Sequence, residues 1–546
     1  MTLRNLLALL AVVVLLAWFW SRGERFLDAN GPTFDEPVHL AAGYSYWTTG
    51  NFRLNREDPP LLKLLWAAPL ALRDQSLYPR DVASATNDDH WHVANAFLYG
   101  SGRAPRELLN PARRVNLALG CGVVLLAGWW GYRLWNARLA GLGAVAFAVC
   151  DPNLLALSCV LTTDVGLTLF ALLTCYLLWE YTAAPSRGLL IAAGVALGLA
   201  LGAKFSALAL VTGLGTAGVV YVLRGGVLAL PGAPEGKSRS RQAAEFGFRL
   251  GLIALVALAA TYGFVHFDQW GRGLKFQLTR ADHGDGVMYL NGERSRTGWY
   301  HYVLVLLPLK LPLGLMGAAL LAVPALRRAP CAAFLLIPPL VFFALASYSR
   351  VNLGVRVVLP VLPFVYVLAA GVASGSCCRL AGRALLVVCV AWAGISAARS
   401  DPHPLAYFNE LADGPRGALR FVADSNLDWG QGLPALAEYI RANDLGPVYL
   451  SYFGTDRPEA HCIRFHPLPT YGRVGAPGGE AIPLTATRHV VVVSANNLLG
   501  IYLNDRDTFA FLRGREPTTI LAGCLYVFDL TNDADALRRV RALPPH

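Results

Sequence analysis

The sequence Thr-Phe-Asp-Glu-Pro-Val-His at residues 33–39 lies just after the first apolar segment, and Asp-Pro-Pro-Leu-Leu-Lys follows at residues 58–63. Two adjacent carboxylates, Asp35 and Glu36, therefore stand close to lipid, where charge is costly and usually has a function. If a helix begins here, Asp35 and His39 share one face, whereas Glu36 points about 100° away. The same residues would also suit a helix start, with Asp35 as the cap and a proline in the first turn. The local pattern leaves a chemical site and a capped helix both open.

Most of the remaining chain consists of apolar segments. Of the 546 residues, 55% are hydrophobic and 15% are charged, and the mean hydropathy is +0.43, far from the average of a soluble protein. Runs of about 20 apolar residues are long enough to cross a membrane as helices. The predicted spans lie at 5–20, 115–135, 138–156, 160–181, 188–203, 205–223, 247–266, 300–325, 330–348, 354–374 and 382–398. The sequence therefore predicts an all-α polytopic membrane domain of about 11 transmembrane helices.

Two apolar segments differ from the other predicted spans. Residues 61–72 are too few to cross a membrane and are expected to lie along its surface. The first span, 5–20, has the composition of a signal peptide as well as of a membrane anchor. No small-residue cleavage site follows it, which favours a retained anchor.

Basic residues determine the predicted orientation. With a cytoplasmic N-terminus, the inner loops hold most of them, as the positive-inside rule requires. These residues are Arg133, Arg138, Arg187, Arg224, Lys237, Arg239, Arg241, Arg249, Arg327, Arg328, Arg379 and Arg383. The bias also accounts for the net charge of +11, so no nucleic acid is expected as a partner. The Asp35 loop, the 150–164 turn, Lys204, the 267–299 loop and the 349–356 turn would then share the outer face.

The composition changes after about residue 400, where charged residues and turn formers increase. Strands are predicted at 448–452, 489–493 and 520–528, and helices at 432–442 and 534–542. We therefore expect two domains. A transmembrane domain spans residues 1–399 with its catalytic loop at 21–114, and a small extracytoplasmic α/β domain spans residues 400–546.

Cysteine and histidine patterns give weaker indications. Most of the ten cysteines lie in or beside apolar spans, but Cys462 and Cys524 lie in the polar region and could form a disulfide. Residues 88–92, Asp-Asp-His-Trp-His, could bind a metal, although a solvated loop is favoured because no further ligands are defined. Residues 424–432, Asp-Ser-Asn-Leu-Asp-Trp-Gly-Gln-Gly, could contact an acceptor or close over a site, or could simply form turns.

The pattern Phe34-Asp35-Glu36-x-x-His39, followed by Pro59-Pro60-Leu61-x-Lys63, resembles the first outer loop of the dolichyl-phosphate-mannose protein mannosyltransferases. It is also similar to that of their bacterial relatives, including the aminoarabinose transferases that modify lipid A. Two positions depart from the family pattern. Asp58 precedes the double proline, where mannosyltransferases usually have histidine and aminoarabinose transferases lysine, so a basic role there would pass to Lys63 or Arg56. Leu157 stands where family members often have histidine.

The resemblance implies a C-type membrane glycosyltransferase of the bacterial inner (plasma) membrane, which transfers a sugar from a polyprenyl phosphate to an acceptor hydroxyl. Asp35 would be the general base of an inverting reaction, with Glu36 as its catalytic neighbour that positions the loop. Cations hold the phosphate leaving group in such a reaction. The predicted substrate-binding residues are His39, Lys63, Asp164, Lys204, His283 and Arg356.

Other interpretations of these residues stay open. Lys63, Lys204 and Arg356 taken singly suit interfacial anchors, and Asp164, after two threonines, suits a helix cap. No cofactor is required, because side chains supply the cations, while a divalent metal stays an alternative. The acceptor is a protein, a lipid or a glycan, and membrane lipid surrounds the chain. The alternative function is a transporter or flippase of lipid-linked sugars, which usually shows repeated halves; a scaffold presenting residues 400–546 is a third.

Overall fold

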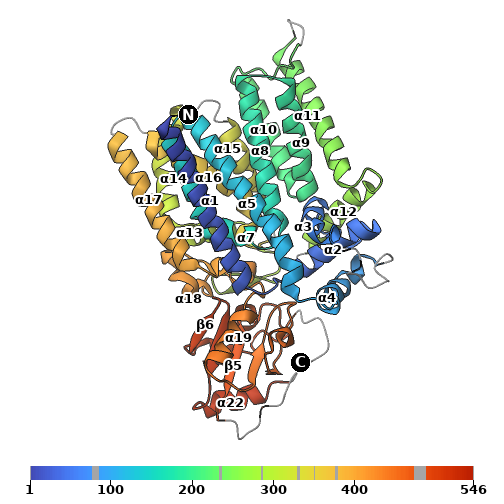
Figure 1. The fold of residues 1–546 in the computed structure, drawn as a ribbon, viewed down its shortest axis with the longest axis vertical. Coiled ribbons are helices and arrows are strands. Elements are labelled where there is room, and N and C mark those ends of the chain that lie inside the picture. The colour runs from blue at the N-terminus through green and yellow to red at the C-terminus, as the bar shows by residue number, and fades with distance from the viewer. Residues whose placement is uncertain are drawn as a thin grey trace.

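The computed structural model describes the chain except residues 1, 75, 77–84, 233–236, 284–286, 329–332, 350, 375–378, 472–481, 483–486 and 545–546. The side chains of residues 281–283, 327, 328, 374 and 379 also lie outside the description. Long helices form the upper part of the molecule, and a small sheet domain lies at the end remote from the N-terminus (Figure 1).

The helical part is made of helices that follow one another closely. In the N-terminal half they are α1 (Leu3–Ala29), α2 (Glu36–Thr49), α3 (Leu61–Ala71), η2 (Asn87–Asp89), α4 (His90–Gly100), α5 (Pro105–Trp135), α6 (Arg138–Val149), α7 (Pro152–Ser158), α8 (Thr163–Ala183), α9 (Arg187–Ala203), α10 (Ala207–Leu223), α11 (Arg239–Thr261) and α12 (Asp268–His283). A hairpin of β1 (Met288–Leu290) and β2 (Glu293–Ser295) leads to α13 (Tyr302–Lys310), α14 (Leu313–Ala322), η3 (Val323–Arg328), α15 (Ala333–Tyr348), η4 (Val355–Val361), α16 (Leu362–Ala369), η5 (Ala370–Ser374) and α17 (Arg379–Ser400).

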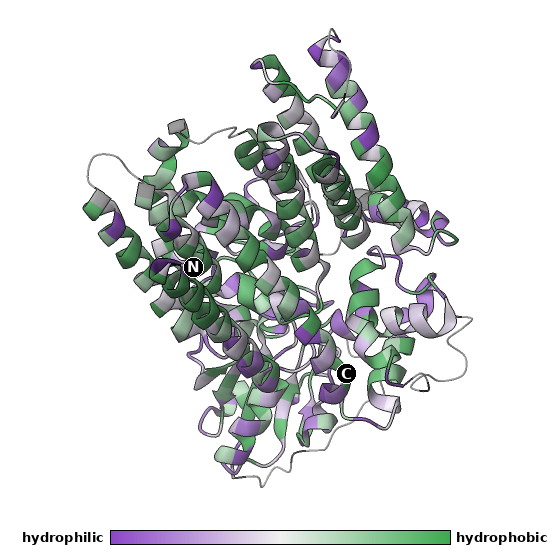
Figure 2. Cartoon of the chain, turned by 45° about the horizontal axis from the view of Figure 1, so that its top comes forward, coloured by the Kyte–Doolittle hydropathy of each residue, from purple (hydrophilic) through white to green (hydrophobic). Residues whose placement is uncertain are grey.

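Apolar helices cover every predicted span. By length and composition, six helices among the described residues can cross a membrane, or up to eight if two bent pairs each count as one span. The shorter apolar helices α9, α10 and α15 cover the remaining predicted spans, and α3 is also short. The helices are apolar along most of their length (Figure 2), and α1 buries only 6% of its apolar window, so most of its surface is left for lipid. The chain is a multi-pass membrane protein.

Two predicted spans are bent rather than straight. The predicted span 138–156 consists of α6 and α7, which meet at 63°, and the predicted span 300–325 is bent by 110° between α13 and α14. Helix α7 begins at Pro152, and α14 begins just after Pro312; a proline disfavours helical geometry in the residue before it. At the first bend, the Asp151 carboxylate accepts a hydrogen bond from the Asn153 N–H at 2.8 Å and so caps α7.

Helices α2, α3 and α4 fill the long segment between α1 and α5. A close approach between α2 and α3 depends on Gly43, because a Cβ atom there would lie 2.0 Å from the Lys63 carbonyl oxygen. Within its described residues, the segment is thus helical, and α3 also packs against α5.

The C-terminal part is a small α/β domain, as predicted. Its five strands have the order β4-β3-β5-β7-β6, with β3 parallel to β4 and β5, and β7 antiparallel to β5 and β6. The strands are β3 (Val448–Ser451), β4 (Phe465–Pro467), β5 (Val490–Ser494), β6 (Thr519–Leu521) and β7 (Leu525–Asp529). The helices are η6 (Pro404–Ala406), η7 (Glu410–Ala412), α18 (Gly414–Ala418), η8 (Asp424–Asn426), α19 (Leu433–Ala442), η9 (Pro458–His461), α20 (Ala495–Leu498), α21 (Ala510–Arg513) and α22 (Ala534–Arg541).

One predicted strand of this domain is wrong in detail. Residues 520–528 were expected to form a single strand but form the β6–β7 hairpin. Ala522 and Gly523 have positive φ angles of 49° and 69°, which turn the chain in the middle of an apolar run.

Two buried basic side chains, Arg22 and Lys310, join this domain to the helices. The Arg22 guanidinium of α1 lies 2.9 Å from the Asp401 carboxylate just beyond α17. At the bend after α13, the buried Lys310 ammonium donates hydrogen bonds to the carbonyl oxygens of Leu405, Tyr407 and Asn426 at 2.8–3.0 Å. These contacts fix the domain against the ends of the membrane helices.

Candidate active site

A cavity of about 580 Å³ lies where the membrane helices end and the C-terminal domain begins. Its walls come from the segment before α2, the start of α8, the α9–α10 turn, α12, η4 and the C-terminal domain. Segments far apart in sequence therefore form one chamber. Of the predicted site residues, Asp35, His39, Lys204 and Arg356 line it.

Asp35 occupies the position just before α2, and Pro37 lies in the first turn of that helix. The Asp35 side chain is 33% exposed, and its Oδ2 lies 3.3 Å from a guanidinium nitrogen of Arg356. The Arg356 guanidinium also lies over the Trp429 ring, 4.5 Å from its centre. An exposed carboxylate, a fixed cation and an aromatic surface from three distant segments thus meet in the cavity.

Lys204 ends α9 and supplies a second cation. Its Nζ lies 2.6 Å from Oδ1 of Asp164, which is buried in the first turn of α8. The Thr162 hydroxyl donates a hydrogen bond to the other oxygen of the same carboxylate. Asp164 does not line the cavity but holds Lys204, which does. The structure therefore gives Asp164 an indirect contact with the site.

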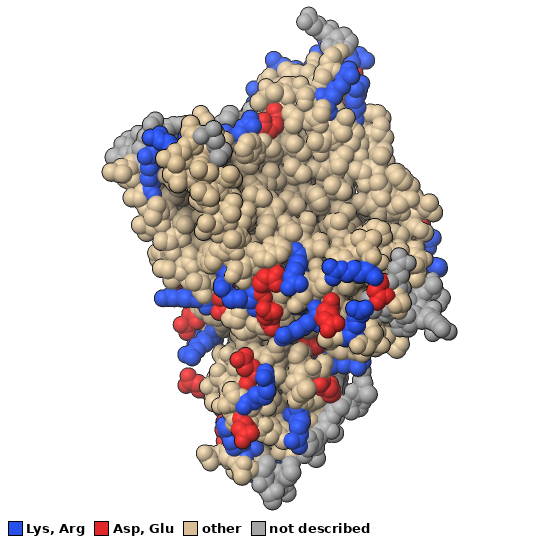
Figure 3. Space-filling view, in the orientation of Figure 1, with Lys and Arg blue, Asp and Glu red and all other residues tan. Residues whose placement is uncertain are grey.

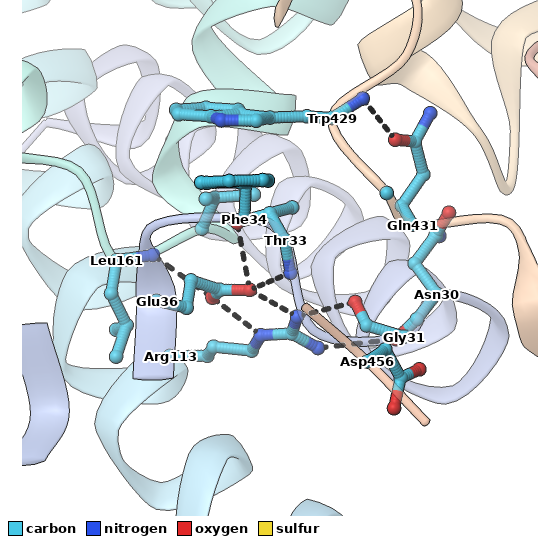
Figure 4. Close-up of polar contacts among 12 residues, drawn as sticks. Asn30, Gly31, Thr33, Phe34, Glu36, Arg113, Leu161, Trp429, Gln431 and Asp456 are labelled. Carbon is cyan, nitrogen blue, oxygen red and sulfur yellow. Dashed lines mark hydrogen bonds and ion pairs between the residues drawn. The ribbon is translucent and has the colours of Figure 1, made fainter. Parts of the chain in front are cut away.

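Glu36 has surroundings quite unlike those of Asp35. Its carboxylate is completely buried and accepts hydrogen bonds from Arg113 at 2.6 and 2.8 Å, and from the N–H groups of Thr33 and Leu161 at 2.7 and 3.0 Å (Figure 4). Arg113 in turn donates to the carbonyl oxygen of Gly31 at 2.8 Å. Glu36 does not line the cavity; these hydrogen bonds fix the loop that carries Asp35, which is the positioning role expected for it, and its place in the catalytic pair stays a prediction.

Lys63 also lies elsewhere than predicted. Its ammonium is completely buried and donates hydrogen bonds to the carbonyl oxygens of Asn55 and Asp58 at 2.6 and 2.8 Å. Burial lowers the pKa of Lys63 to about 8. Since Lys63 does not line the cavity, the structure gives it no contact with a phosphate; it supports the chain that bears Asp58.

Asp58, the residue that departs from the family pattern, faces the cavity. Burial raises the pKa of its carboxyl group, but the positive charges of Lys204, Lys63 and Arg356 help to outweigh that effect, so that the pKa is lowered overall. Asp58 is therefore an anion at neutral pH. An acidic residue thus precedes the double proline here, and Lys204 brings positive charge to the same cavity.

Of the two histidines predicted to bind substrate, only His39 has a described side chain. His39 lines the cavity, and burial lowers its pKa, so that the imidazole is neutral at pH 7. Its Nδ1 is buried and has no hydrogen-bond partner among the described residues. His283 is the last residue of α12, and its side chain lies outside the described part of the chain.

Several cavity residues were not singled out as site residues from the sequence. Arg280 of α12 lines the cavity and pairs with Glu57 at 2.7 Å, so the segment predicted as an outer loop contributes a helix to the wall. Asp424 and Trp429, from the 424–432 string, line it too, which supports the interpretation that this string closes over the site. Three aromatic residues of the C-terminal domain had no signal in the sequence: Phe453, Tyr471 and Tyr502.

The structure also bears on the possible metal site at residues 88–92 and on the possible disulfide between Cys462 and Cys524. Within the described ranges, no group of three or more His, Cys, Asp or Glu side chains is arranged to hold a metal ion. From residues 88–92, His90 and Trp91 line the cavity. The pairing of Cys462 with Cys524, which the sequence left open, is not present: Cys462 is exposed, Cys524 is buried, and both are free.

Comparison with known proteins agrees with the sequence resemblance. Residues 110–225 match the family model of dolichyl-phosphate-mannose-protein mannosyltransferase. The search of curated proteins gave no match. The crystal structure of ArnT from Cupriavidus metallidurans in the apo state is similar over 97% of this chain and 98% of that chain, with 14% sequence identity and a TM-score of 0.50.

Two further structures are more distant. ArnT from the same organism bound to undecaprenyl phosphate has 16% identity and a TM-score of 0.48, over 98% of this chain and 99% of that chain. The Pmt1-Pmt2 complex of S. cerevisiae bound to the sugar donor has 18% identity and a TM-score of 0.34, over 50% of this chain and 34% of that chain. The apo ArnT match includes the C-terminal domain, so the predicted fold class is confirmed. The predicted resemblance is also confirmed: this chain has the fold of the ArnT-type and mannosyltransferase-like membrane glycosyltransferases.

Proposed function

We propose that this protein transfers a sugar from a polyprenyl-phosphate carrier to an acceptor hydroxyl at the outer face of the bacterial inner membrane, with inversion at the sugar carbon. One observation carries the proposal: the Asp35 carboxylate shares a cavity at the ends of the membrane helices with the cations Lys204 and Arg356. A carrier lipid would place its phosphate at this level, beside fixed positive charge.

The charge distribution supports the outer face. In Figure 3, a wide uncharged band separates two charged regions, and the region remote from the C-terminal domain shows mainly Lys and Arg. An excess of basic residues marks the cytoplasmic side of a membrane protein. The cavity and the C-terminal domain lie at the opposite end, which would be extracytoplasmic.

The chemistry follows from the placement of the charged groups. Asp35 takes the proton of the acceptor hydroxyl, and the acceptor oxygen forms a bond to the anomeric carbon of the sugar. The bond between that carbon and the phosphate oxygen breaks, and the electron pair leaves with the carrier phosphate. Lys204 and Arg356 stabilise the added negative charge. Attack opposite to the leaving phosphate inverts the configuration.

The Asp35–Arg356 pair connects donor binding to the base. A guanidinium nitrogen of Arg356 lies 3.3 Å from Oδ2 of Asp35. An arriving phosphate competes for the same guanidinium, and Arg356 can share its several donors between the two anions. Donor binding would thereby weaken the hold on Asp35 and make its carboxylate a better base.

Replacing the base tests this function. We expect Asp35→Asn to abolish transfer, because an amide cannot accept the acceptor proton, while folding and binding of the carrier phosphate persist. Asp28→Asn changes an exposed aspartate of α1 that does not line the cavity and should keep wild-type activity. Mass spectrometry of lipids and glycoproteins from cells with wild-type protein, either variant or none would identify the product. A fully active Asp35→Asn variant would refute the assignment of the base.

A further inference from the structure

The wall that the C-terminal domain adds to the cavity carries a carboxylate, Asp424. Its backbone has a left-handed conformation with φ of 59°, which aspartate adopts more readily than most residues other than glycine. The Asp424 N–H donates a hydrogen bond to the side-chain oxygen of Asn496 at 2.8 Å, which helps to hold this conformation. The domain thus fixes the backbone that carries this carboxylate at the cavity.

Several neighbouring groups form hydrogen bonds or electrostatic interactions with the Asp424 carboxylate. It accepts a hydrogen bond from the Tyr502 hydroxyl. Burial raises the pKa of Asp424 to about 6, while the positive charge of Arg356 acts in the opposite direction. The charged and titratable groups that act on it are Arg356, Asp35, Tyr502, Tyr302 and Asp428. Asp424 and the proposed base Asp35 therefore interact with each other and with the same cation, Arg356.

Aromatic rings continue the wall beside Asp424. Tyr502 stacks on Phe453 and Tyr471, with ring centres 5.4 and 5.2 Å apart. Phe453 also stacks on Phe34, the residue before Asp35, at 5.2 Å. The Tyr471 side chain is 47% exposed, so part of the aromatic surface stays open to the cavity.

A carboxylate beside open aromatic rings is well suited to bind a sugar ring. The carboxylate oxygens accept hydrogen bonds from neighbouring hydroxyl groups, and the aromatic surface packs against the apolar C–H face of the ring. Packing between domains alone would explain the buried ring Phe453, but it would not explain a largely desolvated carboxylate at the cavity wall.

We propose that Asp424, Tyr502 and Tyr471 form a subsite for a pyranose ring, which makes the C-terminal domain part of substrate recognition. This inference rests on the proposed function, because the ring would belong either to the transferred sugar or to a glycan acceptor. Asp424 binds hydroxyl groups in this proposal, whereas Asp35 alone takes the proton.

Sugar binding can be measured without turnover. Saturation-transfer NMR on the full-length protein in detergent would use a panel of probes: methyl pyranosides of mannose, glucose and galactose, and methyl 4-amino-4-deoxyarabinopyranoside. We expect at least one probe to bind wild type, and Asp424→Asn and Tyr502→Phe to weaken that binding at least tenfold. Glu438→Gln changes an exposed carboxylate of α19 outside the cavity and should bind like wild type. Binding of no probe, or equal binding by wild type and Asp424→Asn, overturns the subsite.

Kinetics distinguish the two sources of the ring. If the ring is the transferred sugar, Asp424→Asn raises KM for the lipid-linked donor about tenfold and leaves KM for the acceptor unchanged; a glycan acceptor gives the reverse. In both cases kcat should stay within about threefold of wild type. In wild type, the affected KM should rise as pH falls below about 6, because Asp424 becomes protonated, and this rise should be missing in Asp424→Asn. A loss of kcat with unchanged KM values overturns the subsite.

Failure of the subsite and failure of the proposed function give different results. A wild-type protein that transfers nothing but loses pyranoside binding in Asp424→Asn contradicts the transferase and supports the subsite. Transfer that depends on Asp35 but is indifferent to Asp424 supports the transferase and contradicts the subsite.

Discussion

At the scale of single residues, two adjacent carboxylates have opposite surroundings. Asp35 is partly exposed beside Arg356, whereas Glu36 is buried against Arg113. Their side chains leave the chain at the start of α2 in different directions, so one faces the cavity and the other faces the protein interior. The Asp-Glu pair thus combines a group available for chemistry with a group that fixes its position.

Removing the charge of Glu36 should destabilise the protein. Glu36→Gln leaves the Arg113 guanidinium buried without its counter-charge, which costs about 3–5 kcal/mol for a buried pair. The matched control is Glu24→Gln, which breaks the more exposed pair of Glu24 and Arg114 and should cost less than about 1 kcal/mol. Thermal unfolding in detergent, followed by tryptophan fluorescence, checks both variants. Equal unfolding temperatures for the two variants would contradict a structural role for Glu36.

The sequence indicated which charged residues would lie at one side of the membrane, but it could not place every one of them. Asp35, Lys204 and Arg356 meet because the ends of membrane helices on one side lie at one level. Lys63 was misplaced, because a lysine in the first turn of an apolar helix can face lipid, a ligand or the protein interior, and the sequence does not say which. The loop-positioning role of Glu36 was expected, but its partner Arg113 could not be named, because it is 77 positions away, beyond any local pattern.

At the scale of helices and strands, hydropathy located the apolar helices but not their bends. Averaging over about 20 residues finds a span whether or not it is straight. The breaks at Pro152 and Pro312 depend on prolines, but prolines also occur within continuous helices of this chain, such as Pro111 in α5. A proline alone therefore does not predict a break. Tertiary contacts, such as those of Lys310 at the bend between α13 and α14, also contribute.

The packing of α2 on α3 gives a prediction at this scale. Gly43→Ala should destabilise the protein by about 1–3 kcal/mol, because the new methyl group would meet the Lys63 backbone at 2.0 Å. Activity should fall as well, since α2 positions Asp35 and His39. Gly251→Ala in α11 is the control: no atom lies within 4 Å of the added Cβ, so stability should stay within about 1 kcal/mol of wild type. Unfolding temperatures and transfer rates of the two variants test this packing, which an unchanged Gly43→Ala protein would contradict.

At the scale of the whole molecule, the C-terminal domain is part of the cavity rather than an appendage. Lys310 holds it through three carbonyl oxygens at the bend between α13 and α14. The sequence predicted the existence of the domain and the strands β3 and β5, but it merged β6 and β7 into one strand and did not predict β4. It could not predict the docking, because the contacts are between backbone groups and single side chains that carry no periodic pattern.

Loosening this junction should be visible by proteolysis. Lys310→Met leaves buried carbonyl oxygens without donors, which costs about 1–3 kcal/mol for each group. Local opening around residues 400–430 should then increase, and proteinase K should cleave there on the order of tenfold faster. Lys275→Met, at an exposed position of α12, should leave the cleavage rate unchanged. Equal cleavage of the two variants would show that Lys310 does not hold the domain.

The backbone around Asp35 is bonded to the far end of the chain, which affects how the protein is made. The Gly31 N–H donates to the Gln431 carbonyl at 3.0 Å, and the Phe34 N–H donates to the Trp429 carbonyl at 2.8 Å. The Thr455 hydroxyl donates to the Phe34 carbonyl across 421 positions of sequence. At translation rates of about 5–20 residues per second, the ribosome needs roughly 20–80 s to make that stretch. During that time, a nascent chain carries Asp35 without the C-terminal segments that contact its backbone. A prematurely terminated product that lacks these segments would therefore be inactive.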